Sequence, residues 1–89
     1  MNNGDYSNMD RTLRIINIEK NDEKISMDCY CEKHKADYFR LVLDANSYQT
    51  LYNSLNRRNV YYRKAKEYIK EMCLSGKTLP SKIDIKWES

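Results

Sequence analysis

The sequence predicts a two-layer α+β domain in which a mainly antiparallel, four-stranded sheet carries one or two helices on one face. Two observations lead to this prediction. Apolar and polar residues alternate over most of residues 12–44 and again over 81–88, which is the pattern of strands with one buried face. Between these stretches apolar residues recur at intervals of three and four, as in amphipathic helices. The expected order of elements is β-β-β-α-α-β.

The first strand is expected over Thr12–Lys20, with a bulge where the alternation slips at Ile15–Ile16. Asn21 and Asp22 supply the residues of a tight turn. Lys24–Glu32 then alternates regularly and should bury Ile25, Met27, Cys29 and Cys31 on one face. Tyr38–Asp44 is expected to form the third strand, with Phe39, Leu41 and Leu43 on its buried face. Short connections between the three strands favour an antiparallel meander.

The apolar period changes to that of a helix after Asp44. One stripe consists of Tyr48, Leu51, Tyr52 and Leu55, and a second of Tyr62, Ala65, Ile69, Met72 and Cys73. Both stripes share one heptad phase, which allows a single helix of about 29 residues, roughly 43 Å long. Strands of seven residues span only about 23 Å, so two helices with a break near 56–60 are favoured. Gly76 is a helix-ending residue, and Ser81–Glu88 reads as the last strand.

Length and composition indicate one small domain. The chain of 89 residues can form a single modest core, so we expect a disordered N-terminal tail over 1–10 and one α+β domain over 11–89. No stretch reaches the roughly 18 apolar residues of a membrane span. The polar start, MNNGDYSNMD, does not resemble a secretory signal. With an odd number of cysteines, this favours a reducing cytoplasm.

The stretch CYCEKH, residues 29–34, raises the question of a metal site. Cys29, Cys31, His34 and Cys73 would together make a Cys₃His set for zinc. However, Cys29 and Cys31 continue the apolar face of the second strand, and free cysteine behaves as a small buried hydrophobe. We therefore expect no metal and no cofactor, with a zinc-stabilised domain as the least favoured alternative. A redox role is disfavoured too, because no C-x-x-C motif is present.

The sequence lacks the recognisable signatures of an enzyme. The chain has one histidine, no glycine-rich phosphate loop and no nucleophile elbow. Its carboxylates are scattered, and no nucleophile lies at a catalytic spacing from a base. The prediction is therefore a protein without catalytic activity.

The second predicted helix carries the best candidate contact surface. Residues 57–77 hold seven basic and two acidic residues, a net charge of +5, whereas residues 1–56 carry −2. Arginine and lysine neutralise phosphates, and tyrosine rings serve as stacking platforms or interface anchors. A solvated helix face with no function would look the same. The expected partner-binding residues are Arg57, Arg58, Tyr61, Lys64, Tyr68 and Lys70.

These observations favour a small cytoplasmic accessory protein, of inhibitor or adaptor type, that acts by binding. Asn, Lys, Ile and Tyr, whose codons are AT-rich, make up 34 of the 89 residues, which favours a bacterial or mobile-element origin. The expected partner is a protein, and a nucleic-acid-handling protein would fit. Direct nucleic-acid binding is the alternative: the pI of about 8.7 is modest for a dedicated binder, so weak non-specific binding is expected. The sequence does not indicate the oligomeric state.

Overall fold

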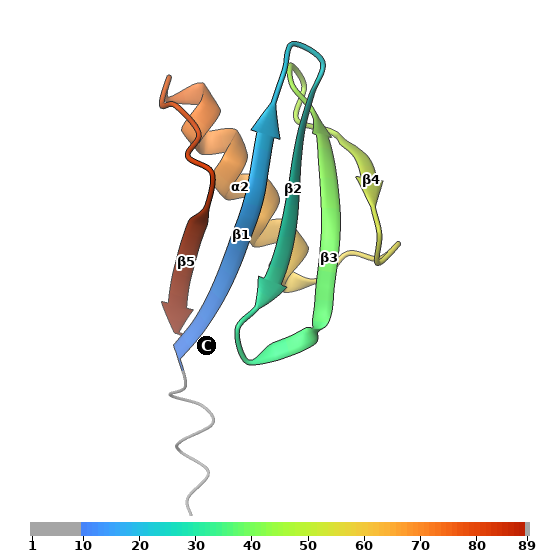
Figure 1. The fold of residues 1–89 in the computed structure, drawn as a ribbon, viewed down its shortest axis with the longest axis vertical. Coiled ribbons are helices and arrows are strands. Elements are labelled where there is room, and N and C mark those ends of the chain that lie inside the picture. The colour runs from blue at the N-terminus through green and yellow to red at the C-terminus, as the bar shows by residue number, and fades with distance from the viewer. Residues whose placement is uncertain (1–9, 89) are drawn as a thin grey trace, which may run out of the picture.

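The computed structural model describes residues 10–88, with the side chains of 12–33 and 38–86. It is an α+β fold with one antiparallel sheet and one helix, as Figure 1 shows. The strands are β1 (Asp10–Lys20), β2 (Lys24–Cys31), β3 (His34–Asp44), β4 (Thr50–Asn53) and β5 (Ile83–Glu88), and the helix is α2 (Val60–Leu74). The predicted class is confirmed, but the sheet has five strands where four were predicted. The expected tail lies outside the described residues, except for Asp10.

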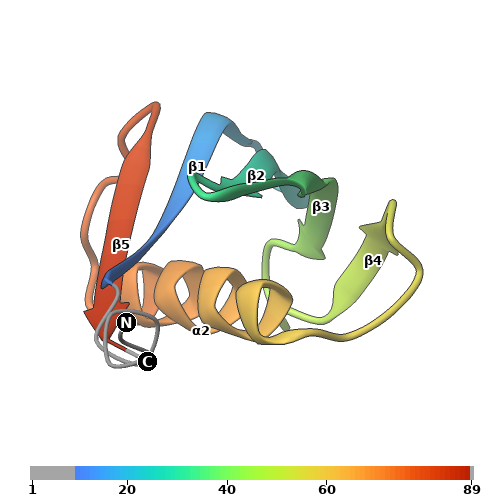
Figure 2. The same ribbon diagram turned by 90° about the horizontal axis from the view of Figure 1, so that it is seen from below.

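The sheet order is β4-β3-β2-β1-β5. The first four strands form a meander, and α2 then returns the chain across the sheet so that β5 pairs with β1. Figure 2 shows the sheet curved around α2, with β5 and β4 at its two edges. One layer is therefore the sheet and the other is a single helix, which packs against β1 and β2. The described residues form no helix that is long and apolar enough to cross a membrane.

The predicted buried face of the sheet is confirmed. Side chains of β1, β2 and β3 with essentially no exposed area form the core under α2: Leu13, Ile15, Ile25, Met27, Cys29, Cys31, Phe39, Leu41 and Leu43. The bulge expected at Ile15–Ile16 lies slightly later, between Ile16 and Glu19. Ile16 pairs with Asp28 and Glu19 pairs with Ser26, so two residues of β1 lie opposite one residue of β2. One extra residue therefore lies in β1, and Asn17 takes a left-handed backbone with φ of 55°.

The prediction of a helix over residues 48–55 is wrong, because this segment forms a turn followed by β4. The side chain of Asp44 accepts backbone hydrogen bonds from Asn46 and Ser47, each 2.8 Å long. The backbone of Tyr48 is left-handed, with φ of 63°, which ends any helical path. Asp, Asn and Ser use their side chains in this way both in turns and at helix N-caps, so the sequence pattern alone did not separate the two.

The helix α2 begins and ends with well-defined caps. The side chain of Asn59 accepts a 2.7 Å hydrogen bond from the backbone N–H of Tyr62, which is the contact of an N-cap. At the other end Gly76 has φ of 76°, and the N–H groups of Gly76 and Lys77 donate to the carbonyls of Cys73 and Met72. This is a Schellman motif, and it confirms Gly76 as the residue that ends the helix. A single 15-residue helix replaces both the two-helix and the 29-residue alternatives.

Candidate functional site at β4 and the start of α2

Five of the six predicted partner-binding residues fall into three groups in the structure, and the sixth, Tyr61, is buried. Arg57 and Arg58 are exposed in the connection between β4 and α2, where they border one surface pocket. Lys64 and Tyr68 are exposed on the helix itself, and Tyr68 borders a different pocket toward its C-terminal end. Lys70 is partly buried, and the helical rotation of 100° per residue puts it about 120° around the axis from Lys64. The six residues therefore do not share one face.

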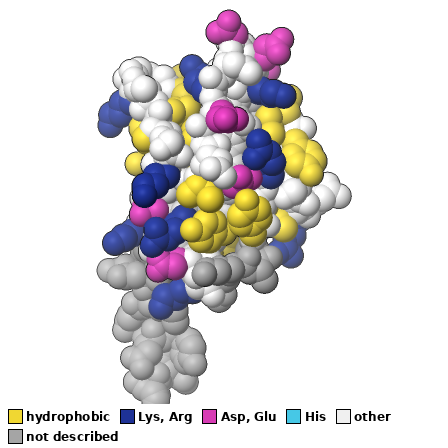
Figure 3. All heavy atoms as spheres, in the orientation of Figure 1, with side chains coloured by type: hydrophobic (Ala, Val, Ile, Leu, Met, Phe, Trp, Pro, Cys, Tyr) yellow, Lys and Arg dark blue, Asp and Glu magenta, His cyan; other side chains and the backbone are white. Residues whose placement is uncertain are grey.

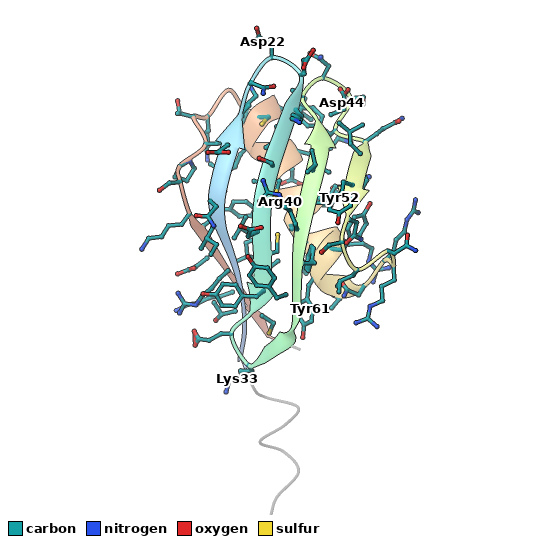
Figure 4. All side chains as sticks on the ribbon, turned by 45° about the vertical axis from the view of Figure 1, so that its right-hand side comes forward. Asp22, Lys33, Arg40, Asp44, Tyr52 and Tyr61 are labelled. Carbon is teal, nitrogen blue, oxygen red and sulfur yellow. The ribbon has the colours of Figure 1, made fainter. Side chains whose placement is uncertain are left out.

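Tyr61 belongs to the core and not to the surface. Only 6% of its area is exposed, and it packs in the same cluster as Tyr62, Ala65 and Ile69. The side chain lies where α2 meets the sheet, near the beginning of the helix (Figure 4). Its ring is therefore not available to a partner at the surface.

Two residues that the sequence pattern assigned to a helix core are instead exposed beside the arginines. Leu51 and Tyr52 have 56% and 53% of their area exposed, and Figure 4 labels Tyr52 at β4. These two side chains line a pocket of about 330 Å³ together with Arg57, Arg58 and Tyr62. We call Leu51, Tyr52, Arg57 and Arg58 the β4–α2 surface.

A bulge in β4 explains why two consecutive side chains are exposed. Val42 of β3 pairs with Tyr52 and the next residue, Leu43, pairs with Thr50, so Leu51 has no opposite residue. In a regular strand neighbouring side chains point to opposite faces, and Leu51 would point toward the helix layer. The extra residue in β4 breaks this alternation and leaves both Leu51 and Tyr52 exposed to solvent.

The connection that carries the arginines is held by side-chain hydrogen bonds. Asn53 donates from Nδ2 to the carbonyl of Arg57 at 2.7 Å and accepts at Oδ1 from the N–H of Leu55 at 3.1 Å. In the pocket lining, the hydroxyl groups of Thr50 and Tyr62 hydrogen-bond to each other and join β4 to α2. The backbone that presents the arginines is therefore fixed relative to Leu51 and Tyr52.

The β4–α2 surface is electrostatically one-sided. The lining of its pocket includes two guanidinium groups and no carboxylate. Guanidinium groups stay charged at every physiological pH and pair with carboxylates or phosphates through two parallel hydrogen bonds. The pocket therefore favours an anionic group, bound next to an apolar or aromatic one.

The open face of the sheet is the other large surface of the molecule, and its charges pair among themselves. Figure 3 shows this face, with hydrophobic side chains in the middle and charges of both signs around them. Arg14 forms ion pairs with Glu32 at 2.5 Å and with Asp84 at 3.5 Å. The rings of Tyr30 and Tyr38 stack with their centroids 6.1 Å apart, in agreement with a cross-strand pair. An anionic partner would therefore meet arginines that already have counter-charges.

Asp28 at the centre of this face is the only buried charged side chain among those described. It is 8% exposed and accepts hydrogen bonds from Asn17 Nδ2 at 2.9 Å and from Arg40 Nη1 at 3.0 Å. Burial acts to raise the pKa of the Asp28 carboxyl, but the hydrogen bonds and the charge of Arg40 outweigh it, and the pKa lies below its ordinary value. Because all its strong partners hold the ionised form, Asp28 stabilises the sheet.

The cysteines of CYCEKH lie in the core. Cys29 and Cys31 are buried, and burial raises the pKa of the Cys29 thiol far above its ordinary value, which keeps the thiol protonated. Cys73 is partly buried on α2, and the side chain of His34 lies outside the described residues. Among the described side chains, no group of three or more Cys, His, Asp or Glu could hold a metal ion.

The sequence signal for this site was incomplete. The clustered positive charge identified Arg57 and Arg58. The helical spacing of Tyr48, Leu51, Tyr52 and Leu55 instead predicted a buried helix face, so the exposure of Leu51 and Tyr52 was not predicted. The β-branched and aromatic content of Thr50–Tyr52 was the available sign of a strand. Comparison of the chain with protein-family models, with curated proteins and with solved structures found no match. Its function is therefore inferred from its own surfaces.

Proposed function

We propose that this protein is a small, non-catalytic binding protein of adaptor or inhibitor type, and that it contacts a partner protein through the β4–α2 surface. The observation that supports this most is the exposed pair Leu51 and Tyr52 beside Arg57 and Arg58 around one pocket. Tyrosine and arginine dominate the energetic centres of protein interfaces. Large apolar side chains that remain in water next to such residues are typical of interaction sites.

The proposed compartment is the cytoplasm. The three cysteines of the chain are free thiols in the structure, and thiols of this kind persist in reducing compartments. Two of them are core residues, so their oxidation would disturb the packing under α2.

Direct binding of nucleic acid is the second candidate function, and the net charge of +5 over residues 57–77 favours it. We rank it behind protein binding for two reasons. The basic side chains are spread around α2, with Lys64 and Lys70 on different sides, so they do not form one groove. On the open face, Tyr38 of the stacked Tyr30–Tyr38 pair lies next to the carboxylate of Asp28, and a carboxylate repels a phosphate backbone.

The proposal is tested by affinity capture from a nuclease-treated extract of cells that encode the protein. The bait is the wild type beside two variants with equal charge change, R57E/R58E and R63E/K64E. The second pair lies on the exposed side of α2 and outside the pocket lining. Thermal unfolding of all three baits first establishes that they are folded.

We expect a partner that the wild type and R63E/K64E retain and that R57E/R58E loses. Charge reversal at a binding surface slows association and removes specific pairs, whereas the control changes net charge alone. A partner that all three baits retain equally, or that both variants lose, would contradict a role for the β4–α2 surface.

A further inference from the structure

We propose that the β4–α2 surface recognises a protein segment in which an acidic side chain lies next to a large apolar one. Side-chain contacts bind this segment, and the segment does not add a strand to the sheet. This inference rests on the proposed function and specifies the partner. It follows from the charge of the pocket, from the position of the apolar pair and from the bulge in β4.

The charge of the pocket selects the acidic side chain. Arg58 is exposed at the pocket, and the lining residues include no carboxylate that could pair with it. A carboxylate brought by the partner would form a charge-assisted pair, which is stronger than a neutral hydrogen bond. A lysine at the same position would meet two guanidinium groups of its own sign, which costs binding energy.

The exposed pair Leu51 and Tyr52 selects the apolar side chain. Both line the pocket together with the arginines, so an apolar group bound against them would be removed from water at about 25 cal/mol per Å² of buried area. Leu51 has no ring for a nucleic-acid base to stack on. The combination of an aliphatic and a phenolic side chain therefore fits an apolar amino-acid side chain better than a base.

A second copy of this chain does not satisfy these requirements. In a two-fold symmetric contact each subunit presents the same patch to the other. Two β4–α2 surfaces would bring together four arginines, and the pocket linings would supply no carboxylate to pair with them. The occupant is therefore a different protein that carries the acidic group.

The bulge argues against recognition by strand addition. β4 is the edge of the sheet, but it has only four residues, and Leu51 interrupts its register with β3. Short, bulged edge strands are one way in which proteins prevent edge-to-edge pairing. The backbone ladder that a partner strand would need is thus short and irregular, while two side chains stand out from it.

The test uses synthetic ten-residue peptides and the ¹⁵N-labelled protein. The probe peptides are blocked at both ends and contain a central Glu-Leu or Glu-Phe pair among Ser, Thr and Gly. Matched peptides carry Lys in place of Glu, or Ala in place of the apolar residue, and a fourth series is N-methylated on alternate backbone nitrogens. Short single-stranded oligonucleotides form the last arm. Binding is measured from amide chemical shifts, with residues 50–58 as the reporting segment.

We expect the Glu-Leu or Glu-Phe peptides to shift residues 50–58 and to bind about tenfold more tightly than the Lys or Ala series, a difference of about 1.4 kcal/mol. The R58E variant should lose the preference for Glu over Lys peptides, because the pocket lining then holds one guanidinium group and one carboxylate. N-methylated peptides should keep their affinity within about threefold, because a side-chain mode makes little use of the ladder.

Several outcomes would overturn the inference. These are no binding of any peptide at millimolar concentration, an unchanged preference in R58E, loss of binding on N-methylation, and tighter binding of the oligonucleotides. Its failure is distinguishable from failure of the proposed function. A captured partner that depends on Arg57 and Arg58 but fails to show the acidic–apolar preference would refute the inference alone, whereas capture independent of the surface would refute the proposed function.

Discussion

Asp28 shows how one buried charge on the open face of the sheet contributes to stability. Its carboxylate is buried and held ionised by Asn17 and Arg40, and its pKa is lowered in the folded state. A lowered folded pKa means that the stabilisation is fully present above the unfolded pKa, about 3.9 for Asp. The stabilisation is lost as the pH falls through the folded pKa.

Asp28→Asn should therefore destabilise the protein by about 1–3 kcal/mol at pH 7, because two hydrogen bonds to a charged group lose their charge. The difference from the wild type should shrink as the pH falls below about 4, because the unfolded carboxyl is protonated there and the folded carboxyl becomes protonated at still lower pH. Urea unfolding at pH 7 and pH 3 measures both values. Asp22→Asn, at the exposed β1–β2 turn, is the matched control and should stay within about 0.5 kcal/mol. A pH-independent difference would contradict this account.

Cys29 is a second residue whose role depends on burial. If it is a core residue, Cys29→Ser buries a hydroxyl group and should cost about 1–3 kcal/mol more than Cys29→Ala, which adds no polar atom. If it were a zinc ligand, both changes would remove the metal and destabilise the protein alike. Urea unfolding of the two variants separates these cases. Elemental analysis of protein purified without chelators should find no stoichiometric zinc, and one retained equivalent would refute the core interpretation.

At the scale of elements, the strands and the helix differ in how far local sequence determines them. Regular alternation of apolar and polar residues was sufficient to predict β2. The helix α2 begins at an Asn59 cap and ends at a Gly76 cap, and both caps can be recognised in the sequence. β4 was missed because its four residues are too short for an alternation to be seen. Its apolar residues also happen to fall at helical spacing. The hydrogen bonds of Asp44 that close the preceding turn decide between the two structures.

Gly76→Ala tests the end of α2. The backbone at Gly76 has φ of 76°, and an added Cβ would meet no atom within 4 Å. The cost should therefore come from the left-handed backbone alone and be about 1–2 kcal/mol. Gly76→Asn should cost less, because asparagine tolerates this conformation. Thermal unfolding of both variants gives the comparison, and equal stability of Gly76→Ala and wild type would show that the turn relaxes without cost.

At the scale of the whole molecule, the sequence predicted the layers but not how the chain closes the sheet. β5 pairs with β1 in a regular register from Asp10↔Glu88 to Ile15↔Ile83, and this contact joins the two ends of the described chain. Such long-range pairing leaves no local pattern in a sequence. The same limit applies to the site, because Leu51 and Tyr52 became surface residues only through the pairing of β4 with β3.

The distribution of charge over the whole molecule leads to the last prediction, which separates the two candidate functions. Residues 57–77 carry +5 and the rest of the chain −2, so the protein should bind oligonucleotides weakly and without sequence preference. We expect dissociation constants near the non-specific range of about 10⁻⁴–10⁻⁶ M, and a log–log salt slope of about −0.9 per phosphate neutralised on duplex and about −0.7 on single strands. Fluorescence anisotropy with labelled duplex and single strands at about 50 and 200 mM salt measures both.

The variants R57E/R58E and R63E/K64E should weaken this binding to a similar extent, because non-specific attraction depends on total charge more than on position. A loss of binding in R57E/R58E but not in R63E/K64E is expected only for the protein partner. For that partner, Leu51 and Tyr52 supply the contact area beside the arginines. Submicromolar binding at the higher salt concentration, or a dependence on the rings of Tyr52 or Tyr68, would instead mean that nucleic acid is the partner. The two arginines would then act as phosphate contacts and Tyr52 as a stacking platform.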